Sequence, residues 1–169
     1  MRILVCVLFF AVFTGSASAF ELKGITLGEK TSTAQIESAM GVKCDVGANE
    51  MQVCNGQTTI GGVPGVANIV VSPQGILQRI HFSFDADSFE ELAEAFVGKY
   101  GAHTTRNDIV QNGFGAKFES PSKAWTLKNG NRIDLSKNAA TLGKGFIAYS
   151  TPADRARLNG ARKANRGDL

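Results

Sequence analysis

Apolar residues recur at helical spacing in a short segment near the N-terminus. Ser32 precedes it and forms, with Gln35, the pattern of a capping box, in which each side chain pairs with an otherwise free backbone N–H. Gly41 follows in the position where a left-handed residue ends many helices. The pattern therefore predicts a helix of about two turns. Its apolar face consists of Ile36, Ala39 and Met40.

A second, longer apolar stripe predicts a helix that ends at Gly101. Asp87 and Ser88 are the candidate N-caps, because a glutamate follows each of them three residues later. Carboxylates in the first turn also suit the positive end of the helix dipole. The apolar face is formed by Phe89, Leu92, Ala93, Phe96 and Val97.

Alternating apolar and polar residues predict strands before and after the second helix. The clearest strand covers 76–84 and has a buried and a wetter face. The buried face holds Ile76, Ile80, Phe82 and Phe84, and the wetter face holds Leu77, Arg79, His81 and Ser83. Further strands are expected at 20–28, 51–54, 58–60 and 66–72, and at 114–118, 125–127, 133–135 and 145–150. Asn129-Gly130 is predicted to form a type I′ hairpin turn.

The order of these elements repeats along the chain. In each half a lead segment enters a capped helix, the helix ends at glycine, and antiparallel strands follow. We therefore expect an α+β fold of two helix-plus-antiparallel-sheet units in tandem, 20–84 and 85–150, which form one compact body. Each helix would cover one face of a sheet and leave the other face polar or free for a partner.

Residues 1–19 have the three parts of a secretory signal peptide. Arg2 supplies the positive charge, an apolar run follows at 3–13, and Ala17-Ser18-Ala19 forms a small-residue cleavage site before Phe20. The alternative is a membrane anchor, but the run is shorter than the roughly 20 residues that a spanning helix needs. We therefore expect a periplasmic or secreted protein that loses this segment after Ala19.

The formal charge of +3 is distributed unevenly along the chain. The body at 20–150 carries a net −1, and the tail at 151–169 carries +3. The tail is either a solvated terminus, as a short helix or frayed, or a contact for an anionic lipid, a cell-wall polymer or an acidic protein. Nucleic acid is not expected, because the exported chain has no recognition motif. The candidate contact residues are Arg155, Arg157, Arg162, Lys163 and Arg166.

Two cysteines, Cys44 and Cys54, remain once the leader with Cys6 is removed. In an exported chain such a pair most simply forms one structural disulfide. A redox pair is the first alternative, but the C-x-x-C spacing is missing. Half of a metal site is the second, but zinc needs two further ligands and both histidines are distant in the sequence. We expect neither a metal nor another cofactor.

The segment Ile25-Thr26-Leu27-Gly28, followed by Thr31-Ser32-Thr33, a helix and Gly41, resembles the opening of small bacterial envelope proteins. The outer-membrane assembly lipoprotein BamE has one unit of a helix followed by β-hairpins. The β-lactamase inhibitor protein has two in tandem, with a disulfide in a loop after a helix, which is similar to the layout expected here. The resemblance covers most of 22–150 and implies this fold and protein binding. No lipidated cysteine and no inhibitory loop match, so it implies no site residues.

Catalytic arrangements are weighed against simpler interpretations. His81, Ser83 and Asp85 share a strand face, but alternate positions lie about 7 Å apart and do not converge on one reacting atom. His103 is expected to be solvated in a turn. The carboxylates near the second helix are explained by caps and a solvated face. The glycine cluster at 61–65 joins two strands and is expected to be a turn rather than a phosphate cradle.

Two aromatic residues, Trp125 and Tyr149, are either core residues or anchors on an exposed sheet face. Because no catalytic set is found, the sequence predicts a non-enzymatic protein-binding module of the bacterial envelope. One form of it would be an inhibitor of a secreted or periplasmic enzyme. The alternatives are an envelope-acting hydrolase with an unlocated site, and a binder of a small ligand or cell-wall polymer.

Overall fold

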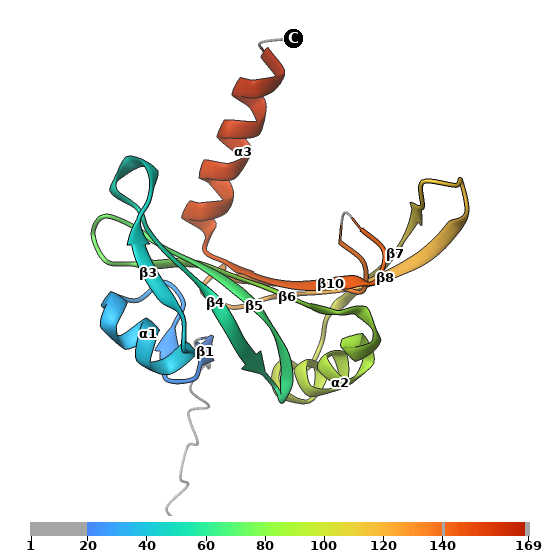
Figure 1. Ribbon diagram of the computed structural model, residues 1–169, viewed down its shortest axis with the longest axis horizontal. Helices are drawn as coiled ribbons and strands as arrows, with labels where there is room; N and C mark the ends of the chain where they lie inside the picture. The colour runs from blue at the N-terminus through green and yellow to red at the C-terminus, as the bar shows by residue number, and fades with distance from the viewer. Residues whose placement is uncertain (1–19, 140, 168–169) are drawn as a thin grey trace, which may run out of the picture.

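The computed structural model describes residues 20–139 and 141–167, with the backbone alone for 164–167. The fold is α+β and is built on one eight-stranded antiparallel sheet, with a separate two-stranded hairpin β1–β2. Figure 1 shows α1 and α2 below this sheet and α3 on its other side. The strand order is β3-β4-β5-β6-β10-β9-β8-β7, so the last strand after α1 pairs with the last strand after α2.

The helices and strands follow in one chain order, with two short 3₁₀ turns between them. The N-terminal elements are β1 (Glu21–Leu22), β2 (Ile25–Thr26), α1 (Thr33–Met40), β3 (Lys43–Val46), a 3₁₀ turn (Ala48–Glu50), β4 (Gln52–Ile60), β5 (Val63–Val71) and β6 (Leu77–Asp85). A second 3₁₀ turn (Ala86–Ser88) leads into α2 (Phe89–Tyr100), β7 (Thr104–Gln111), β8 (Lys117–Thr126), β9 (Arg132–Ser136), β10 (Lys144–Ser150) and α3 (Pro152–Gly167).

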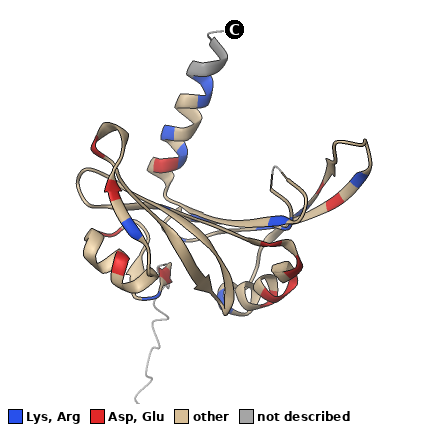
Figure 2. Cartoon of the chain, viewed as in Figure 1, with Lys and Arg blue, Asp and Glu red and all other residues tan. Residues whose placement is uncertain are grey.

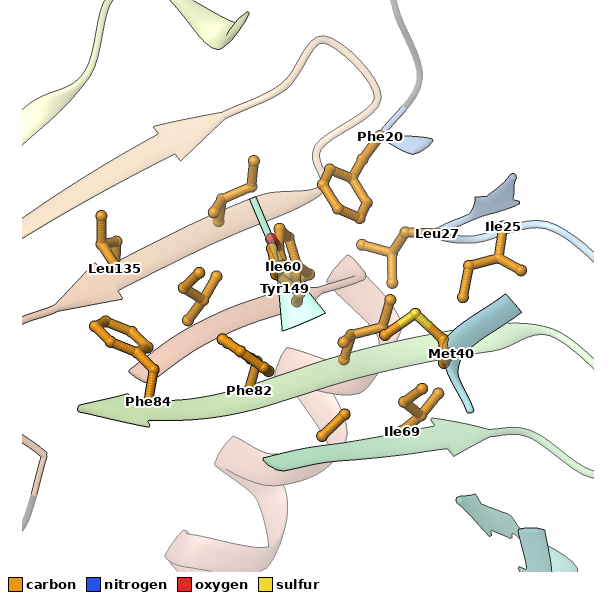
Figure 3. Close-up of a cluster of buried hydrophobic side chains, with 14 of the residues drawn as sticks. Phe20, Ile25, Leu27, Met40, Ile60, Ile69, Phe82, Phe84, Leu135 and Tyr149 are labelled. Atoms are coloured by element: carbon orange, nitrogen blue, oxygen red, sulfur yellow. The ribbon is translucent and has the colours of Figure 1, made fainter. Parts of the chain in front are cut away.

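The core lies between the sheet and the two helices below it. One row of buried residues crosses six paired strands in exact register: Cys54, Ile69, Ile80, Tyr149, Ile133 and Trp125. From α2, Phe96 packs against Trp125 and Tyr149 with ring centroids 5.8 and 6.0 Å apart. Figure 3 shows how Phe20, Leu27 and Met40 extend this cluster toward the N-terminal elements. The row makes the sheet one continuous layer.

The start and end of α1 are as the sequence predicts. The Ser32 hydroxyl accepts a hydrogen bond from the backbone N–H of Gln35, and the Gln35 side chain accepts one from the backbone N–H of Ser32. Gly41 ends the helix in the left-handed conformation, with φ 70°. The predicted end of α2 at Gly101 is also confirmed, and of the two candidate N-caps Ser88 holds the N-cap position. Asp85 caps the 3₁₀ turn before the helix by accepting from the Asp87 N–H, while Ser88 makes no side-chain cap bond.

Several strand predictions need correction in the first half. The segment 20–28 forms two short strands joined by a turn at Lys23 and Gly24, both at positive φ, rather than one strand. The strands expected at 51–54 and 58–60 are one strand, β4, that passes through Asn55-Gly56. Leu77 is buried instead of lying on the wetter face, because a bulge opposite Val70 and Val71 reverses the alternation at the start of β6.

In the second half of the chain the structure differs further from the predicted strands. Phe114 lies in the turn between β7 and β8, whereas a strand was expected there, and β7 itself has too little apolar alternation to be predicted. The Asn129-Gly130 hairpin is present, with the Gly130 N–H donating to the Leu127 carbonyl. It is not a type I′ turn, because Gly130 has positive φ and Asn129 does not.

The predicted disulfide is present. Cys44 of β3 and Cys54 of β4 are directly opposed across the ladder, with Cα atoms 3.9 Å apart, and their sulfurs are bonded. Cys54 is fully buried and adds to the core. A disulfide forms and persists in an oxidising compartment, so this bond indicates where the chain folds. The predicted leader, including Arg2, Cys6 and the Ala19 cleavage site, lies outside the described residues.

Within the described ranges, no helix is long and apolar enough to cross a bilayer.

Candidate functional site

The surface of interest is the open face, defined as the side of the sheet turned away from α1 and α2 (Figure 1). A row of side chains crosses it in register from β4 to β7: Gln57, Val66, Ser83, Phe146, Ser136, Ser122 and Arg106. Val66 is 52% exposed although it is apolar. The described part of the chain places no element over the centre of this row, so the open face is available to a partner.

Phe146 and His81 form the aromatic centre of the open face. Their rings stack with centroids 5.5 Å apart, between β10 and β6. Burial lowers the pKa of His81 below its ordinary value of 6.5, and the positive charge of Arg79 lowers it further. Both effects disfavour the protonated imidazole, so they favour the form that stacks on Phe146 without a charge.

Small side chains leave a hollow beside Phe146. The hollow has a volume of about 510 Å³ and reaches from Phe146 to the edge strand β7. Its floor includes Ser122, Ala124 and Ser136. Two ion pairs border it, Arg132–Asp134 and Arg106–Asp108, each with a shortest N–O distance of 2.7 Å. The hollow therefore presents polar, charge-balanced walls around a small-residue floor.

A helix, α3, stands on one end of the open face. Asp154 is 1% exposed and is paired with Arg157 at 2.8 Å and with Arg79 of β6 at 3.6 Å. Arg155 donates to the carbonyls of Ser150 and Gly130, at 2.9 and 2.7 Å. These contacts attach the first turn of α3 to the sheet, and beyond this turn the helix projects into solvent (Figure 1).

The opposite end of the open face carries the arm, defined as residues 107–119 at the far end of the β7–β8 hairpin. Figure 1 shows the arm rising on the same side of the sheet as α3. Phe114 lies at its tip and is 99% exposed, and Phe118 is 42% exposed. The alternating pattern predicts a strand at Phe114 and does not identify it as a surface residue. The run Asn112-Gly113-Phe114-Gly115 is a turn signal that could have placed it.

The candidate anchors Trp125 and Tyr149 are not on the open face. Trp125 is 1% exposed and its indole N–H donates to the Gly101 carbonyl, while Tyr149 is fully buried. Both side chains point toward the helices because they follow the buried parity of their strands. Their candidate role as anchors on an exposed sheet face is therefore corrected to the alternative, a role in the core, and the partly exposed Phe146 is the aromatic residue of the open face instead.

The tail residues divide into two groups. Arg155 and Arg157 are engaged in the contacts that hold α3 to the sheet, so they are structural. Arg162 and Lys163 are exposed on the projecting part of the helix. Arg166 lies in α3, but its side chain is outside the described residues. The basic surface expected of the whole tail is therefore reduced, among the described side chains, to the outer part of α3.

Carboxylates gather on the outer surfaces of α1 and α2 (Figure 2). Glu37 of α1 and Glu90, Glu91 and Glu94 of α2 lie on the helix side. On the other side four carboxylates are paired with cations: Asp85 with Lys144, Asp108 with Arg106, Asp134 with Arg132, and Asp154 with Arg79 and Arg157. Arg162 and Lys163 of α3 add exposed positive charge on this side.

The two histidines lie in different settings. His81 and Ser83 point to the same face of β6, and neither is within hydrogen-bond distance of the other. His103 packs against Trp125 with ring centroids 5.3 Å apart, and its Nε2 lies 3.3 Å from the Lys123 Nζ. It is therefore packed more closely than the solvated turn expected for it. Among the residues the structure describes, no cluster of histidine, cysteine and carboxylate side chains could hold a metal.

No family model matches the chain. Neither the curated proteins nor the solved structures compared with it include a match.

Proposed function

We propose that the chain is a non-enzymatic protein-binding module that holds its partner against the open face, between α3 and the arm. The observation that supports this most is that two projecting elements rise at opposite ends of one uncovered sheet face (Figure 1). A flat polar sheet face is expected to be smooth and solvated. Here the face instead carries Val66, which is 52% exposed, and the Phe146 ring.

The compartment fits this role. The disulfide between Cys44 and Cys54 places the fold in an oxidising environment. We propose that residues 1–19 direct export and are removed after Ala19, so that the protein acts in the periplasm or outside the cell. An inhibitor of a secreted or periplasmic enzyme is one form that the function takes, in keeping with the resemblance to the β-lactamase inhibitor protein and BamE units.

A matched pair of substitutions tests the open face. Val66→Arg places a large cation on the open face, and Val97→Arg makes the same change on α2, where Val97 is 36% exposed. The mature chain and both variants are immobilised and exposed to an envelope extract. We expect a protein that the parent and Val97→Arg retain equally and that Val66→Arg loses. Equal retention by both variants, or no retained protein at all, contradicts the proposal.

One observation favours a second candidate. The hollow of about 510 Å³ beside Phe146 is large enough for a small ligand or a segment of a polar polymer, and its walls carry the Arg106 and Arg132 guanidinium groups. Binding of soluble peptidoglycan fragments, measured by calorimetry and lost in an Ala124→Trp variant that fills the hollow, would support this ligand-binding function in place of the first.

A further inference from the structure

Phe114 is presented to solvent by an ordered turn. The Asn112 Oδ1 accepts hydrogen bonds from the backbone N–H groups of Phe114 and Ala116, at 3.0 and 2.9 Å. The Gly115 N–H donates to the Asn112 carbonyl at 3.0 Å, and Gly115 adopts positive φ. The turn therefore fixes the backbone on both sides of a side chain that is 99% exposed. A rigid aromatic residue loses little conformational entropy on binding, which is the property of an interface anchor.

The apolar surface continues from the tip along the arm. Phe118 and Val110 are directly opposite across the β7–β8 ladder. Phe118 points to the same face of β8 as Ser122, and Val110 to the same face of β7 as Asp108, so both belong to the open face. Phe118 is 42% exposed. The arm thus extends the open face outward as an apolar strip that ends in Phe114. A partner seated on the open face would meet this strip at its edge.

Charge indicates the chemistry of the partner. The cations Arg162 and Lys163 of α3 are exposed on the same side of the sheet as the arm. Asp85, Asp108 and Asp134 of the open face are already paired with cations of this chain. An acidic surface is therefore the electrostatic complement of this side of the molecule.

A folded protein fits these features better than a lipid surface does. An interfacial helix needs a broad apolar face to bury among the lipids. Of the α3 side chains that the structure describes, Leu158 is the one large apolar group, and its chain neighbours are Arg157 and Asn159. Phe114 is a single aromatic side chain on an otherwise uncharged polar turn, a shape that matches a pocket more closely than a membrane plane.

We propose that Phe114 is the anchor of this protein, inserted into an apolar pocket of a folded partner whose surrounding surface is acidic and faces Arg162 and Lys163. The proposal rests on the proposed binding function of the open face. It adds the contact residue and the kind of surface that the partner offers. Burying a phenylalanine side chain predicts at least a tenfold gain in affinity from this one residue.

The test uses the full mature chain and the protein whose retention depends on Val66. Affinity is measured by surface plasmon resonance for Phe114→Ala, and for Ile109→Ala as the matched control. Ile109 is 61% exposed on the other side of the arm, where it alternates with Asp108 and Val110. We expect Phe114→Ala to weaken binding at least tenfold and Ile109→Ala to change it less than twofold. Arg162→Glu with Lys163→Glu should weaken binding and reduce its dependence on salt.

The outcomes separate the two proposals. If Val66→Arg abolishes binding but Phe114→Ala does not weaken it, the anchor proposal fails and the open-face function stands. If no protein's retention depends on Val66, both proposals fail. Two further measurements would also overturn the anchor proposal: Phe114-dependent binding to vesicles of phosphatidylglycerol and phosphatidylcholine, and a dimer of this chain in analytical ultracentrifugation that Phe114→Ala dissociates.

Discussion

The ring of Phe84 lies over Gly145, its cross-strand partner at the junction of β6 and β10. A Cβ atom on Gly145 would come within 2.6 Å of two carbons of that ring and 2.9 Å of the Ser136 carbonyl. Gly65 of β5 flanks Phe84 on its other side in the same register, and there a Cβ would meet the ring of Phe82. The two glycines let large aromatic rings fill the core where the two halves of the sheet join.

Gly145→Ala should therefore destabilise the fold. The added methyl forces the Phe84 ring from its position in a closely packed core, and overpacking of this kind costs about 1–3 kcal/mol. Denaturant unfolding measures the change in the free energy of unfolding. Gly98→Ala is the control, because Gly98 lies inside α2 with open space around its Cα, and this change should stabilise by about 0.5–1 kcal/mol. A Gly145→Ala variant as stable as the parent would contradict the packing argument.

Features that depend on residues close together in the chain are the ones that the sequence predicts correctly. The capping box at Ser32 and the stop at Gly41 are local features, set by residues within a few positions of one another, and both are predicted correctly. The inward direction of Ile80, Phe82 and Phe84 also follows from period two. The predicted face of Leu77 is wrong because the bulge there depends on how β5 and β6 pair, which is a long-range property.

The site is harder to predict than the fold for the same reason. Trp125 and Tyr149 have residue types that suit either a core or an interface, and only the pairing of their strands decides which face they occupy. The structural role of Arg155 depends on the Gly130 carbonyl, 25 residues away in the chain. Phe114 was taken as part of an alternating run, although the glycines beside it favour a turn.

The alkaline titration of tyrosine should report on the core. The chain has two tyrosines, Tyr100 and Tyr149, and burial raises the pKa of both above the ordinary value of 10.0. In the unfolded chain both ionise near pH 10. The folded state resists this ionisation, so stability is fully present below about pH 10 and falls as the pH rises above it.

We expect phenolate absorbance to stay low in the native protein above pH 10 and to appear together with unfolding, followed by circular dichroism on the same samples. In denaturant the same chain should titrate with an ordinary midpoint. A native protein that gained phenolate absorbance near pH 10 while keeping its circular dichroism would show that the two rings are accessible, contrary to the packing of Tyr149 against Phe20 at 4.1 Å.

Stability should also fall at mildly acidic pH because of His81. Its pKa in the folded state is lowered by burial and by Arg79, so the folded protein resists a proton that the unfolded chain accepts below its ordinary value of 6.5. The free energy of unfolding should therefore decrease as the pH drops below about 6.5, until the folded state also takes up the proton. His81→Gln removes the titrating group and should flatten the curve over that range.

His103→Gln is the matched control for this experiment, since it leaves His81 and Phe146 in contact. In that variant the free energy of unfolding should still decrease at acidic pH, as in the parent. The comparison uses urea unfolding at a series of pH values. If His81→Gln and the parent give parallel curves between about pH 7 and 5, the neutral state assigned to His81 is wrong.

The attachment of α3 depends on Asp154. Its buried carboxylate neutralises two cations, Arg79 of the sheet and Arg157 of the helix, so Asp154→Asn leaves both without an anion. Removing one partner of a buried pair costs about 3–5 kcal/mol, and because both arginines are partly exposed we expect about 2 kcal/mol. Trypsin should also cleave after Arg157 faster than in the parent, because the first turn of α3 is released.

Asp108→Asn is the control for the removal of a carboxylate. The Arg106–Asp108 pair has side chains that are 77% and 47% exposed, so its loss should change stability by less than about 1 kcal/mol. Unfolding curves and the time course of proteolysis are measured on both variants. If Asp154→Asn leaves both unchanged, α3 is held by Arg155 and its two carbonyl partners alone, and the helix would keep its place beside the open face without the buried charge.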